Sequence, residues 1–340
     1  MIEPSRPYMQ VLRPGMFSLL QDLGRVGHQC HGVPVTGAMD EWSHRAANML
    51  VGNADDAAVL ECTLTGPVVQ FTRDTLLAVC GAELCISAAG RPVPMGCAVM
   101  LRGGVPLAFG ERPSGSRGLR AYLAVRGGFA TPPVLGSRST YLPGSFGGHE
   151  GRALRKGDRV PLQPSERGQP SLALERLLVQ SGLPFVTAAR VEVAQPAGSP
   201  EGIRFIAGPQ WHAFSTEARK RFVSQPFTIS ARSDRMGYRL EGPELQLTRP
   251  LEMVSEATSF GTVQVPPDGR PIVLMADRQS AGGYPKLAYV ASADLPRLAQ
   301  AAPGTSIRFT QVDQQAAERA WLHFEDQLAL VQEMAARALA

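Results

Sequence analysis

Glycine and proline interrupt this chain so often that most of its secondary structure must be short. The 340 residues include 35 Gly and 28 Pro. Strand-like apolar runs stand between these turn residues, at 68–71, 76–79, 98–101 and 120–125. Short strands that recur at close spacing with turn signals are typical of a barrel or a sandwich, and not of an alternating βαβ array. The sequence therefore predicts a mainly β protein with few helices.

One helix is expected to interrupt the strands near residues 40–52. Asp40 is a good N-cap residue, Gly52 is a plausible stop, and the apolar residues between them share one face. These are Trp42, Ala46, Met49 and Leu50. The opposite face carries three polar residues, His44, Arg45 and Asn48. Such a face is usually solvated, but the glycine-rich loop 32–40 offers an alternative, because backbone N–H groups at a helix start bind anions.

Three further helices are indicated, at 172–179, at 216–222 and in the tail. In the tail, apolar residues recur at spacings of four and three, which is a helix with a heptad seam. They are Ala317, Trp321, Phe324, Leu328, Val331, Ala335 and Ala338. Two interpretations stay open, because about three heptads are short for an independent coiled coil. The helix is either docked on the body of the protein or a contact between protein molecules in an assembly.

The length and composition favour two globular domains. A chain of 340 residues is long for one core, and 44% apolar with 19% charged residues is a globular composition. Residues 163–200 are richer in Pro, Gln, Ser and Ala, and they end in a linker-like stretch at 196–200. We place the domain boundary there, and expect the second domain to open with a strand at 203–206 and a turn at 208–210.

Charge and hydropathy exclude several classes of partner. The net charge of +4 is spread thinly, and no basic block with interleaved aromatic residues suggests a nucleic-acid surface. No apolar run approaches the roughly 20 residues that a membrane span requires. Residues 1–10 are polar and broken by proline, so no signal peptide is expected. These features predict a cytoplasmic protein.

The distribution of cysteine, histidine and known motifs excludes further chemistry. The five cysteines, Cys30, Cys62, Cys80, Cys85 and Cys97, form no CxxC pair and are interpreted as reduced core thiols. The six histidines are scattered, so no metal site is expected. The chain contains no GxxxxGK[ST] phosphate loop, no GxGxxG after a strand and no GxSxG.

The most suggestive stretch for function is Ser255–Lys286. An apolar run at 271–276 stops abruptly at Asp277-Arg278-Gln279, and a turn at 282–285 then leads to Lys286. An apolar strand that ends in a charged triplet and a glycine pair presents polar groups at a cleft. Lysine occurs only at positions 156, 220 and 286, so Lys286 is unusual for this chain.

Four clusters combine turn glycines with charged residues. They lie at 21–25, at 135–140 with 146–148, at 232–238 and at 277–286. Arginine beside small residues suits carboxylate or phosphate recognition, because the guanidinium forks onto two oxygens. Asp and Lys are candidate proton carriers. Each cluster alone is more often a charged turn, but four of them indicate a composite anion-binding cleft.

The longest of these motifs resemble a known family. The stretches SLLQDLGRVGHQCHGVPVTGAMDEWSHRAANMLVGN, LAVRGGF and PPVLGSRSTYLPGSFGGHEGRALRKGD are similar to the amino half of the allophanate hydrolase subunit 2 family. That family includes the C subunit of 5-oxoprolinase and biotin-dependent carboxyltransferase-like proteins. ISARSDRMGYRLEG and the stretch from Ser255 to Gln300 are similar to its carboxyl half. The resemblance covers residues 9–312.

The resemblance implies two cyclophilin-like β-barrel domains, with a few short helices and a C-terminal helix. We assign residues 1–197 to the N-terminal domain, 198–312 to the C-terminal domain and 313–340 to a helical tail. The implied function is the C subunit of an ATP-dependent 5-oxoprolinase, a hydrolase that opens 5-oxoproline to L-glutamate. Its partners would be a subunit-B-like cyclophilin-fold protein and a subunit-A-like protein, and ATP would be bound with them.

Two alternatives remain beside this assignment. The chain is a component of a biotin-dependent carboxyltransferase of the urea or allophanate type, which needs a separate biotin carrier. Otherwise it is a non-catalytic regulatory partner of a subunit-B-like protein. Fold-level similarity alone does not decide among them.

Residue roles in the predicted site are our own inference from the four clusters and, for Met39 and Asn48, from the loop 32–40 and the helix that follows it. The proposed proton carriers are Asp277, Lys286 and Asp234. The proposed substrate- or anion-binding residues are Arg235, Tyr238, Arg278, Gln279, Gly282, Gly283, Tyr284, Arg138, Ser137, Ser139, Asp22, Arg25, Met39 and Asn48. Stabilisation of developing anionic charge by such groups is often the largest catalytic effect.

Overall fold

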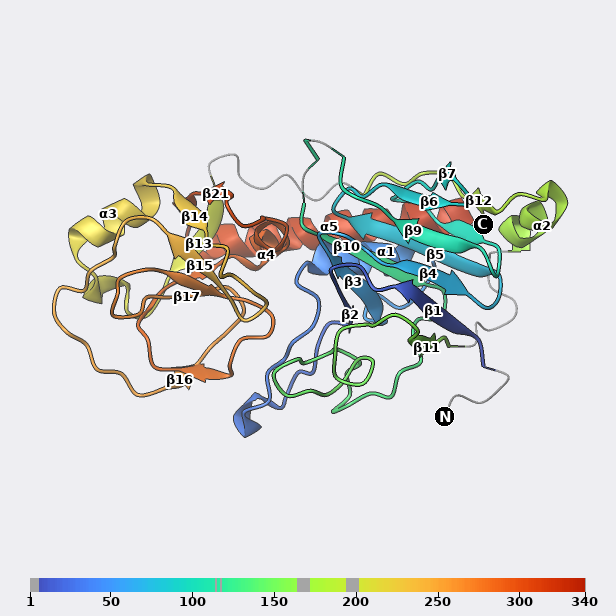
Figure 1. The fold of residues 1–340 in the computed structure, drawn as a ribbon. Coiled ribbons are helices and arrows are strands. Elements are labelled where there is room, and N and C mark those ends of the chain that lie inside the picture. Colours follow the sequence, from blue (N-terminus) through green and yellow to red (C-terminus); the bar gives the residue numbers. More distant parts are fainter. Residues whose placement is uncertain (1–5, 114, 117, 164–171, 194–201, 340) are drawn as a thin grey trace. The chain divides into compact units, whose positions relative to one another are not determined.

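The computed structural model describes residues 6–113, 115–116, 118–163, 172–193 and 202–339. The chain forms two compact units (Figure 1). Unit 1 comprises residues 1–24, 40–195 and 327–340, and unit 2 comprises 25–39 and 196–326. Both units are discontinuous in sequence, because the segment 25–39 belongs with the carboxyl half. The limits 1–197, 198–312 and 313–340 remain a prediction about folding domains, which compactness does not test.

Unit 1 is built on two six-stranded antiparallel sheets. The first has the order β11 (Arg159–Pro161), β1 (Tyr8–Arg13), β4 (Val68–Phe71), β9 (Pro106–Phe109), β6 (Ile86–Ala88) and β7 (Arg91–Pro92). The second has the order β12 (Phe185–Thr187), β8 (Val99–Leu101), β5 (Thr75–Gly81), β10 (Arg120–Val125), β3 (Val59–Thr63) and β2 (Phe17–Gln21). All four strands that the sequence predicted in this half are present.

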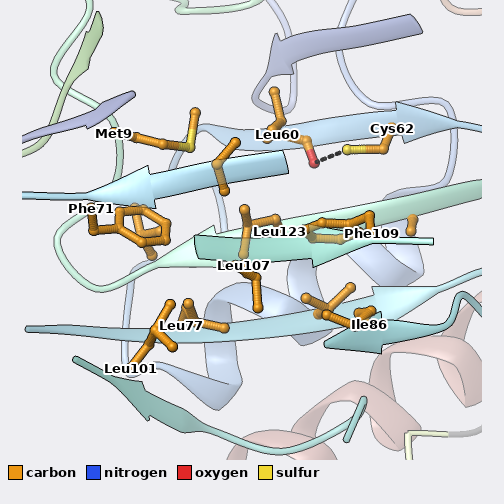
Figure 2. Packing of buried hydrophobic residues seen from close by; sticks show 14 of the residues in the cluster. Met9, Leu60, Cys62, Phe71, Leu77, Ile86, Leu101, Leu107, Phe109 and Leu123 are labelled. Atoms are coloured by element: carbon orange, nitrogen blue, oxygen red, sulfur yellow. Dashed lines mark hydrogen bonds between the residues drawn. The ribbon is translucent and has the colours of Figure 1, made fainter. Parts of the chain in front are cut away.

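Both sheets of unit 1 contribute to one hydrophobic core, shown in Figure 2. Met9, Phe71 and Leu107 come from the first sheet, and Leu77 and Leu123 from the second. Alternate residues of β4 are buried, as expected for a strand with one face on the core. Each such side chain contributes about 1.5–3 kcal/mol when it leaves water. The core therefore explains why a glycine- and proline-rich sequence still folds.

Helix α1 (Glu41–Leu50) packs on β5 and β10 of unit 1. Asp40 caps it as predicted, since its carboxylate accepts a hydrogen bond from the Ser43 backbone N–H at 3.0 Å. The expectation of a solvated polar face is wrong, because His44 and Asn48 are fully buried. Helical periodicity identified the apolar stripe, but it did not reveal that the protein covers the opposite face as well.

The remaining helices are short except for the last. They are α2 (Leu172–Ser181), α3 (Thr216–Ser224), α4 (Leu295–Ala299) and α5 (Gln314–Leu339). Single 3-10 turns lie at Gln29–His31, Trp211–Ala213 and Ser292–Asp294. On α5 the seam residues Phe324, Leu328, Val331 and Ala335 are buried within the chain. Their burial favours the docked-helix interpretation, because a seam reserved for another protein molecule would be exposed.

Unit 2 contains an eight-stranded sheet that curls into a barrel-like shape (mostly yellow to orange in Figure 1). Its order is β21 (Ser306–Ile307), β14 (Phe227–Ile229), β15 (Gly237–Glu241), β18 (Ile272–Leu274), β17 (Thr262–Gln264), β20 (Lys286–Val290), β13 (Ile203–Ala207) and β22 (Phe309–Gln311). The two edge strands, β21 and β22, are separated by a single residue, Arg308. That short connection brings the ends of the sheet together.

Aromatic rings fill the core of unit 2. Phe205, Phe222 and Phe309 contact one another, with the Phe222 and Phe309 rings stacked at 4.5 Å between centroids. The predicted ligand contact Tyr238 lies in this core at 2% exposure, and its hydroxyl donates to the Ala299 carbonyl at 3.4 Å. Its strand turns the ring inward, so Tyr238 packs in the core, and its ligand-binding role stays a prediction.

Two further expectations differ from the structure. The apolar run at 271–276 forms a strand only at Ile272–Leu274, and the chain enters a turn at residues 276–277. The cysteines are all free, but only three are core thiols, since Cys30 and Cys85 are exposed. Among the described residues, no helix combines the length and the apolar character needed to cross a membrane.

Candidate functional site

In unit 1 the first two predicted clusters meet at the Asp22 carboxylate. Oδ1 accepts hydrogen bonds from the Ser137 hydroxyl at 2.6 Å, the Ser139 hydroxyl at 2.5 Å and the Gly24 N–H at 2.8 Å. Oδ2 accepts from the Arg138 backbone N–H. The Arg138 side chain turns to the Thr131 carbonyl at 2.9 Å. Hydrogen bonds to a charged group are each worth about 1.5–3 kcal/mol, so this cluster holds the loop 135–140 against β2.

A buried polar network in unit 1 was not anticipated from the sequence. The Tyr122 hydroxyl donates to Glu61 at 2.9 Å and accepts from the Asp40 N–H at 2.8 Å. Glu61 and Tyr122 are paired across β3 and β10, and both are almost fully buried. His44 packs edge-on against the Tyr122 ring. The one visible signal was Glu61 itself, a carboxylate inside the apolar strand Val59–Thr63.

Burial lowers the pKa of His44 to about 4, which outweighs the opposing influence of nearby carboxylates, chiefly Asp22. The Gln21 backbone also opposes the shift, but in the described part of the chain neither ring nitrogen reaches a partner in good hydrogen-bond geometry. The imidazole is therefore neutral at physiological pH.

Three predicted binding residues have structural contacts. Asn48 closes the end of α1, donating to the Ala57 carbonyl at 2.8 Å and accepting from Asn53 at 3.0 Å. Arg25 is 1% exposed and donates to the Thr36 hydroxyl at 2.6 Å, which stabilises the segment 25–39 of unit 2. Met39 belongs to the hydrophobic core of unit 2. Their ligand-binding roles stay a prediction.

In unit 2 the third and fourth clusters meet in a buried ion pair. Arg235 and Asp277 are bidentate, with Nε–Oδ2 and Nη2–Oδ1 both at 2.9 Å. Nη2 of Arg235 also donates to the Gly37 carbonyl at 2.6 Å. Both residues are at most 5% exposed. Because the guanidinium engages both carboxylate oxygens, Asp277 is held as an anchor for the end of β18.

Arg278 follows this pair and is itself buried. Its guanidinium lies 5.9 Å from the centre of the Phe260 ring, and Nη1 is 3.5 Å from the Met275 carbonyl. Nε has no acceptor among the residues that the structure describes. Desolvation lowers the pKa of Arg278 to about 10, although neighbouring Asp277 opposes the shift. A buried cation with few acceptors attracts an anion.

The other two predicted proton carriers have different surroundings. Lys286 is 2% exposed, and its Nζ donates to Glu256 at 2.7 Å. The pair links β20 to the ribbon of β16 (Glu256–Ala257) and β19 (Ala281–Gly282). Asp234 is exposed and caps its own turn, accepting from the N–H groups of Met236 at 2.8 Å and Gly237 at 3.1 Å.

A polar cavity in the described part of unit 2 has a volume of about 360 Å³. We call it the Gln264 pocket; it lies on the outer face of β15, β17 and β18. Strand alternation explains its location, because Tyr238, Leu240, Val263 and Val273 enter the core. The residues between them face outward and line the pocket: Gly237, Arg239, Gln264, Ile272 and Leu274.

Several predicted binding residues border this pocket. Gln279 and Tyr284 line it, and Gly282 lies against the Gln264 amide. Tyr284 and the turn at 266–268 also border a neighbouring pocket of about 840 Å³, which Gly283 lines. The sequence analysis did not identify Gln264 or Arg239 as binding residues. The alternation Val-Gln-Val at 263–265 was the available signal for Gln264.

The arrangement in unit 2 suits binding and orientation of a polar, anionic small molecule. The pocket combines carboxamide donors with guanidinium groups, which are the usual partners of carbonyl and carboxylate oxygens. Its volume lies at the lower end of the range of about 300–1,000 Å³ for small-molecule sites. Among the described residues, no group of three or more His, Cys, Asp or Glu is placed to hold a metal ion.

Comparison with known proteins assigns the chain to a family. The family described as "Carboxyltransferase domain, subdomain A and B" matches residues 31–311. The chain belongs to this carboxyltransferase domain family, which confirms the resemblance found in the sequence.

Two relatives named as the C subunit of 5-oxoprolinase match almost end to end. The Haemophilus influenzae protein is 37% identical over 88% of this chain and 90% of its own length. The Escherichia coli protein is 38% identical over 89% of this chain and 91% of its own length. A crystal structure of K. lactis urea amidolyase superposes with a TM-score of 0.83 at 29% identity and covers 97% of this chain. This chain spans only 20% of that larger one.

Proposed function

We propose that this chain is the C subunit of an ATP-dependent 5-oxoprolinase, which acts with partner subunits in the hydrolytic opening of 5-oxoproline to L-glutamate. The proposal rests on two features of the match to the 5-oxoprolinase relatives: the sequence identity and the share of their length that is covered. The two bacterial 5-oxoprolinase relatives are 37–38% identical and are matched over 90–91% of their own length. A chain that corresponds to nearly the whole of those proteins is expected to share their task.

The proposed reaction breaks the lactam C–N bond. The carbonyl carbon gains oxygen from water and becomes the side-chain carboxylate of glutamate, while the nitrogen gains a proton and becomes the amine. An amide is a poor electrophile, so ATP supplies the driving force and is converted to ADP and phosphate. The chain has no GxxxxGK[ST] loop, so we assign ATP binding to the assembled subunits.

The contribution of this chain would be to bind and orient the lactam and its developing negative charge. The buried guanidinium of Arg278 and the polar groups of the Gln264 pocket support that role. Asp277 and Lys286 are each held in an ion pair. For Asp277 or Lys286 to transfer a proton, its own ion pair would have to open. Their role in proton transfer is therefore a separate proposal from the role of the chain in binding.

Carboxyl transfer is the second candidate function. The family name and the TM-score of 0.83 to K. lactis urea amidolyase over 97% of this chain favour it. In that case a separate biotinylated carrier would deliver the carboxyl group to an amide substrate. The absence of such a carrier among the gene neighbours would weigh against this function.

The deciding assay measures glutamate released from 5-oxoproline and ATP by this chain, co-purified with the products of neighbouring genes. Release that disappears when this chain is omitted would support the oxoprolinase assignment. Release that continues without this chain would refute it and favour a regulatory role. If the complete set releases no glutamate, the assignment also fails, and carboxylation of urea-type substrates with a biotin carrier becomes the next assay.

Lys286→Met tests the role of the lysine in the same assay. Removing this cation leaves only Glu256, which is half exposed and therefore solvated, so the fold should survive. We expect kcat to fall at least about a hundredfold if Lys286 assists the chemistry, because a general acid or base typically contributes about 10²–10⁴-fold. Lys220→Met on the exposed side of α3 is the matched control. Activity near wild type in both variants would remove Lys286 from the mechanism.

A further inference from the structure

We propose that the Gln264 pocket is the binding site for a small lactam acid, a ring that carries both a carboxylate and an amide carbonyl. This inference rests on the proposed function for its choice of ligand, but its residues are drawn from unit 2 alone. In outline, Gln264 would donate to the lactam carbonyl, arginines at the rim would bind the carboxylate, and apolar residues would pack against the ring.

The first support is the carboxamide of Gln264. Its side chain is 2% exposed and faces the pocket from β17. Among the described residues no acceptor bonds to Nε2. A buried donor without a partner costs about 1–3 kcal/mol, so native proteins rarely retain one without a use for it. A ligand carbonyl would satisfy this donor.

The second support is that the backbone keeps space clear around this amide. A Cβ built on Gly282 would lie 2.7 Å from the Gln264 Nε2 and 3.4 Å from the Gln279 Nε2. Two carboxamides therefore converge on one backbone position that only glycine leaves open. Gly237 on β15 is restricted similarly, because a Cβ there would lie 2.9 Å from Ile272. Larger residues at these two positions would crowd the amide and the pocket wall.

The third support is charge. Arg232, Arg239 and Arg270 line the pocket and are exposed. In the described part of the chain, none of their side chains forms a hydrogen bond or an ion pair. Free guanidinium groups around a cavity attract a carboxylate and bind it with two parallel hydrogen bonds.

Three carboxylates also border the pocket, but each already accepts a local hydrogen bond. Asp234 accepts from two backbone N–H groups of its turn. Glu241 accepts from the Ser230 hydroxyl at 2.7 Å, and Asp268 accepts from the Arg270 N–H at 3.1 Å. Each of these carboxylates therefore has one oxygen engaged by the protein, whereas the three guanidinium groups have no partner among the described residues.

The remaining wall is apolar, as a saturated ring requires. Leu274 is 5% exposed, and Ile272, Pro271 and Met236 lie beside it. This wall distinguishes the pocket from a site for free phosphate or a similar inorganic anion, which offers no surface for apolar contact. A ligand with one acceptor, one anionic group and a few methylenes matches the three kinds of surface present.

The test is calorimetric titration of the full-length chain with L-5-oxoproline, L-proline and 2-pyrrolidinone. Proline keeps the carboxylate but lacks the carbonyl, and pyrrolidinone keeps the lactam but lacks the carboxylate. We expect 5-oxoproline to bind at least about tenfold more tightly than either fragment, because each fragment leaves one set of buried or charged groups unused. Absence of saturable binding, or equal affinity for proline, would overturn the proposal.

Variants assign each contact. Gln264→Leu should weaken 5-oxoproline binding about tenfold and leave proline binding unchanged. Gly282→Ala should weaken 5-oxoproline binding to the same extent, because its methyl group displaces the Gln264 amide. Two independent variants then test the same contact, so a folding defect in one of them does not decide the result. Arg239→Ala should weaken 5-oxoproline and proline but not pyrrolidinone. Gln332→Leu on the exposed face of α5 is the matched control. Unchanged affinity in Gln264→Leu and Gly282→Ala would exclude the pocket.

The pocket and the proposed function fail in different ways. If the complex releases glutamate and its KM for 5-oxoproline is unchanged in Gly282→Ala and Arg239→Ala, the pocket assignment is refuted. The proposed function then remains intact. Saturable 5-oxoproline binding that these variants abolish, without glutamate release by the complete set, would support the pocket and refute the function.

Discussion

Neutralising Asp277 should destabilise unit 2 far more than an ordinary surface substitution. Asp277→Asn removes the anion that faces the Arg235 guanidinium through two contacts of 2.9 Å, at side-chain exposures of 2% and 6%. Breaking one partner of a buried ion pair typically costs about 3–5 kcal/mol, because the other charge stays buried. The Arg235 contact to the Gly37 carbonyl remains, so we expect a loss at the lower end of that range, about 3 kcal/mol.

The measurement is thermal or urea unfolding followed by tryptophan fluorescence, with Trp211 and Trp321 as the reporters within unit 2. One kcal/mol shifts Tm by about 2–4 °C in proteins of 150–250 residues, so Asp277→Asn should lower Tm on the order of 10 °C. Asp326→Asn, at an exposed position on α5, is the control and should change stability by no more than about 0.5 kcal/mol.

A double mutant separates the ion pair from other effects of the substitution. Arg235→Met combined with Asp277→Leu removes both buried charges, and replacement of a buried pair by apolar residues is often close to neutral. The combined loss should therefore be smaller than the sum of the two single losses, by about 1 kcal/mol or more. Additive losses, or a change below about 1 kcal/mol for Asp277→Asn, would show that the pair does not anchor β18.

Three further predictions concern burial and backbone strain. The pKa of His44 is about 4 in the folded chain against an ordinary value of 6.5, so the unfolded state gains the proton first as pH falls. Stability should decline by about 3 kcal/mol between pH 6.5 and pH 4, and His44→Leu should lack that slope in urea titrations. Cys30 and Cys85 are exposed and should react rapidly with a thiol reagent, while the three buried cysteines react only on unfolding; rapid reaction of all five would contradict the fold. Gly148→Ala should destabilise the protein by more than about 2 kcal/mol, and Gly136→Ala by about 1 kcal/mol. Both glycines have positive φ, but only at Gly148 would a Cβ lie 1.9 Å from a neighbouring oxygen. Equal melting temperatures of the two variants would contradict this steric argument.

Sequence patterns predicted the β class and many elements because local rules suffice for them. The strand at 120–125 and the helix capped by Asp40 lie where alternation, periodicity and capping indicated. The same rules misjudged His44 and Asn48, because a polar helix face is solvated only if nothing else packs there.

The fold brings together some of the residues that were assigned to the predicted site, while their roles stay a prediction. Asp22 does meet Ser137, and Arg235 meets Asp277. Sequence could not indicate that distant donors engage both oxygens of each carboxylate, since partners this far apart in the chain are brought together only by the fold. It also missed Gln264, whose significance depends on an unpaired amide nitrogen beside Gly282.

The sequence by itself determined that this chain is a mainly β protein of the carboxyltransferase domain family, because turn residues, short apolar runs and long motifs are local properties of a chain. Only the tertiary structure decided which charged residues are anchors and which line a pocket. The physical reason is that a charged or polar side chain has the same composition and local signature in either role. Its role depends on whether the fold supplies it with a partner, as for Asp277, or leaves it facing a cavity, as for Gln264.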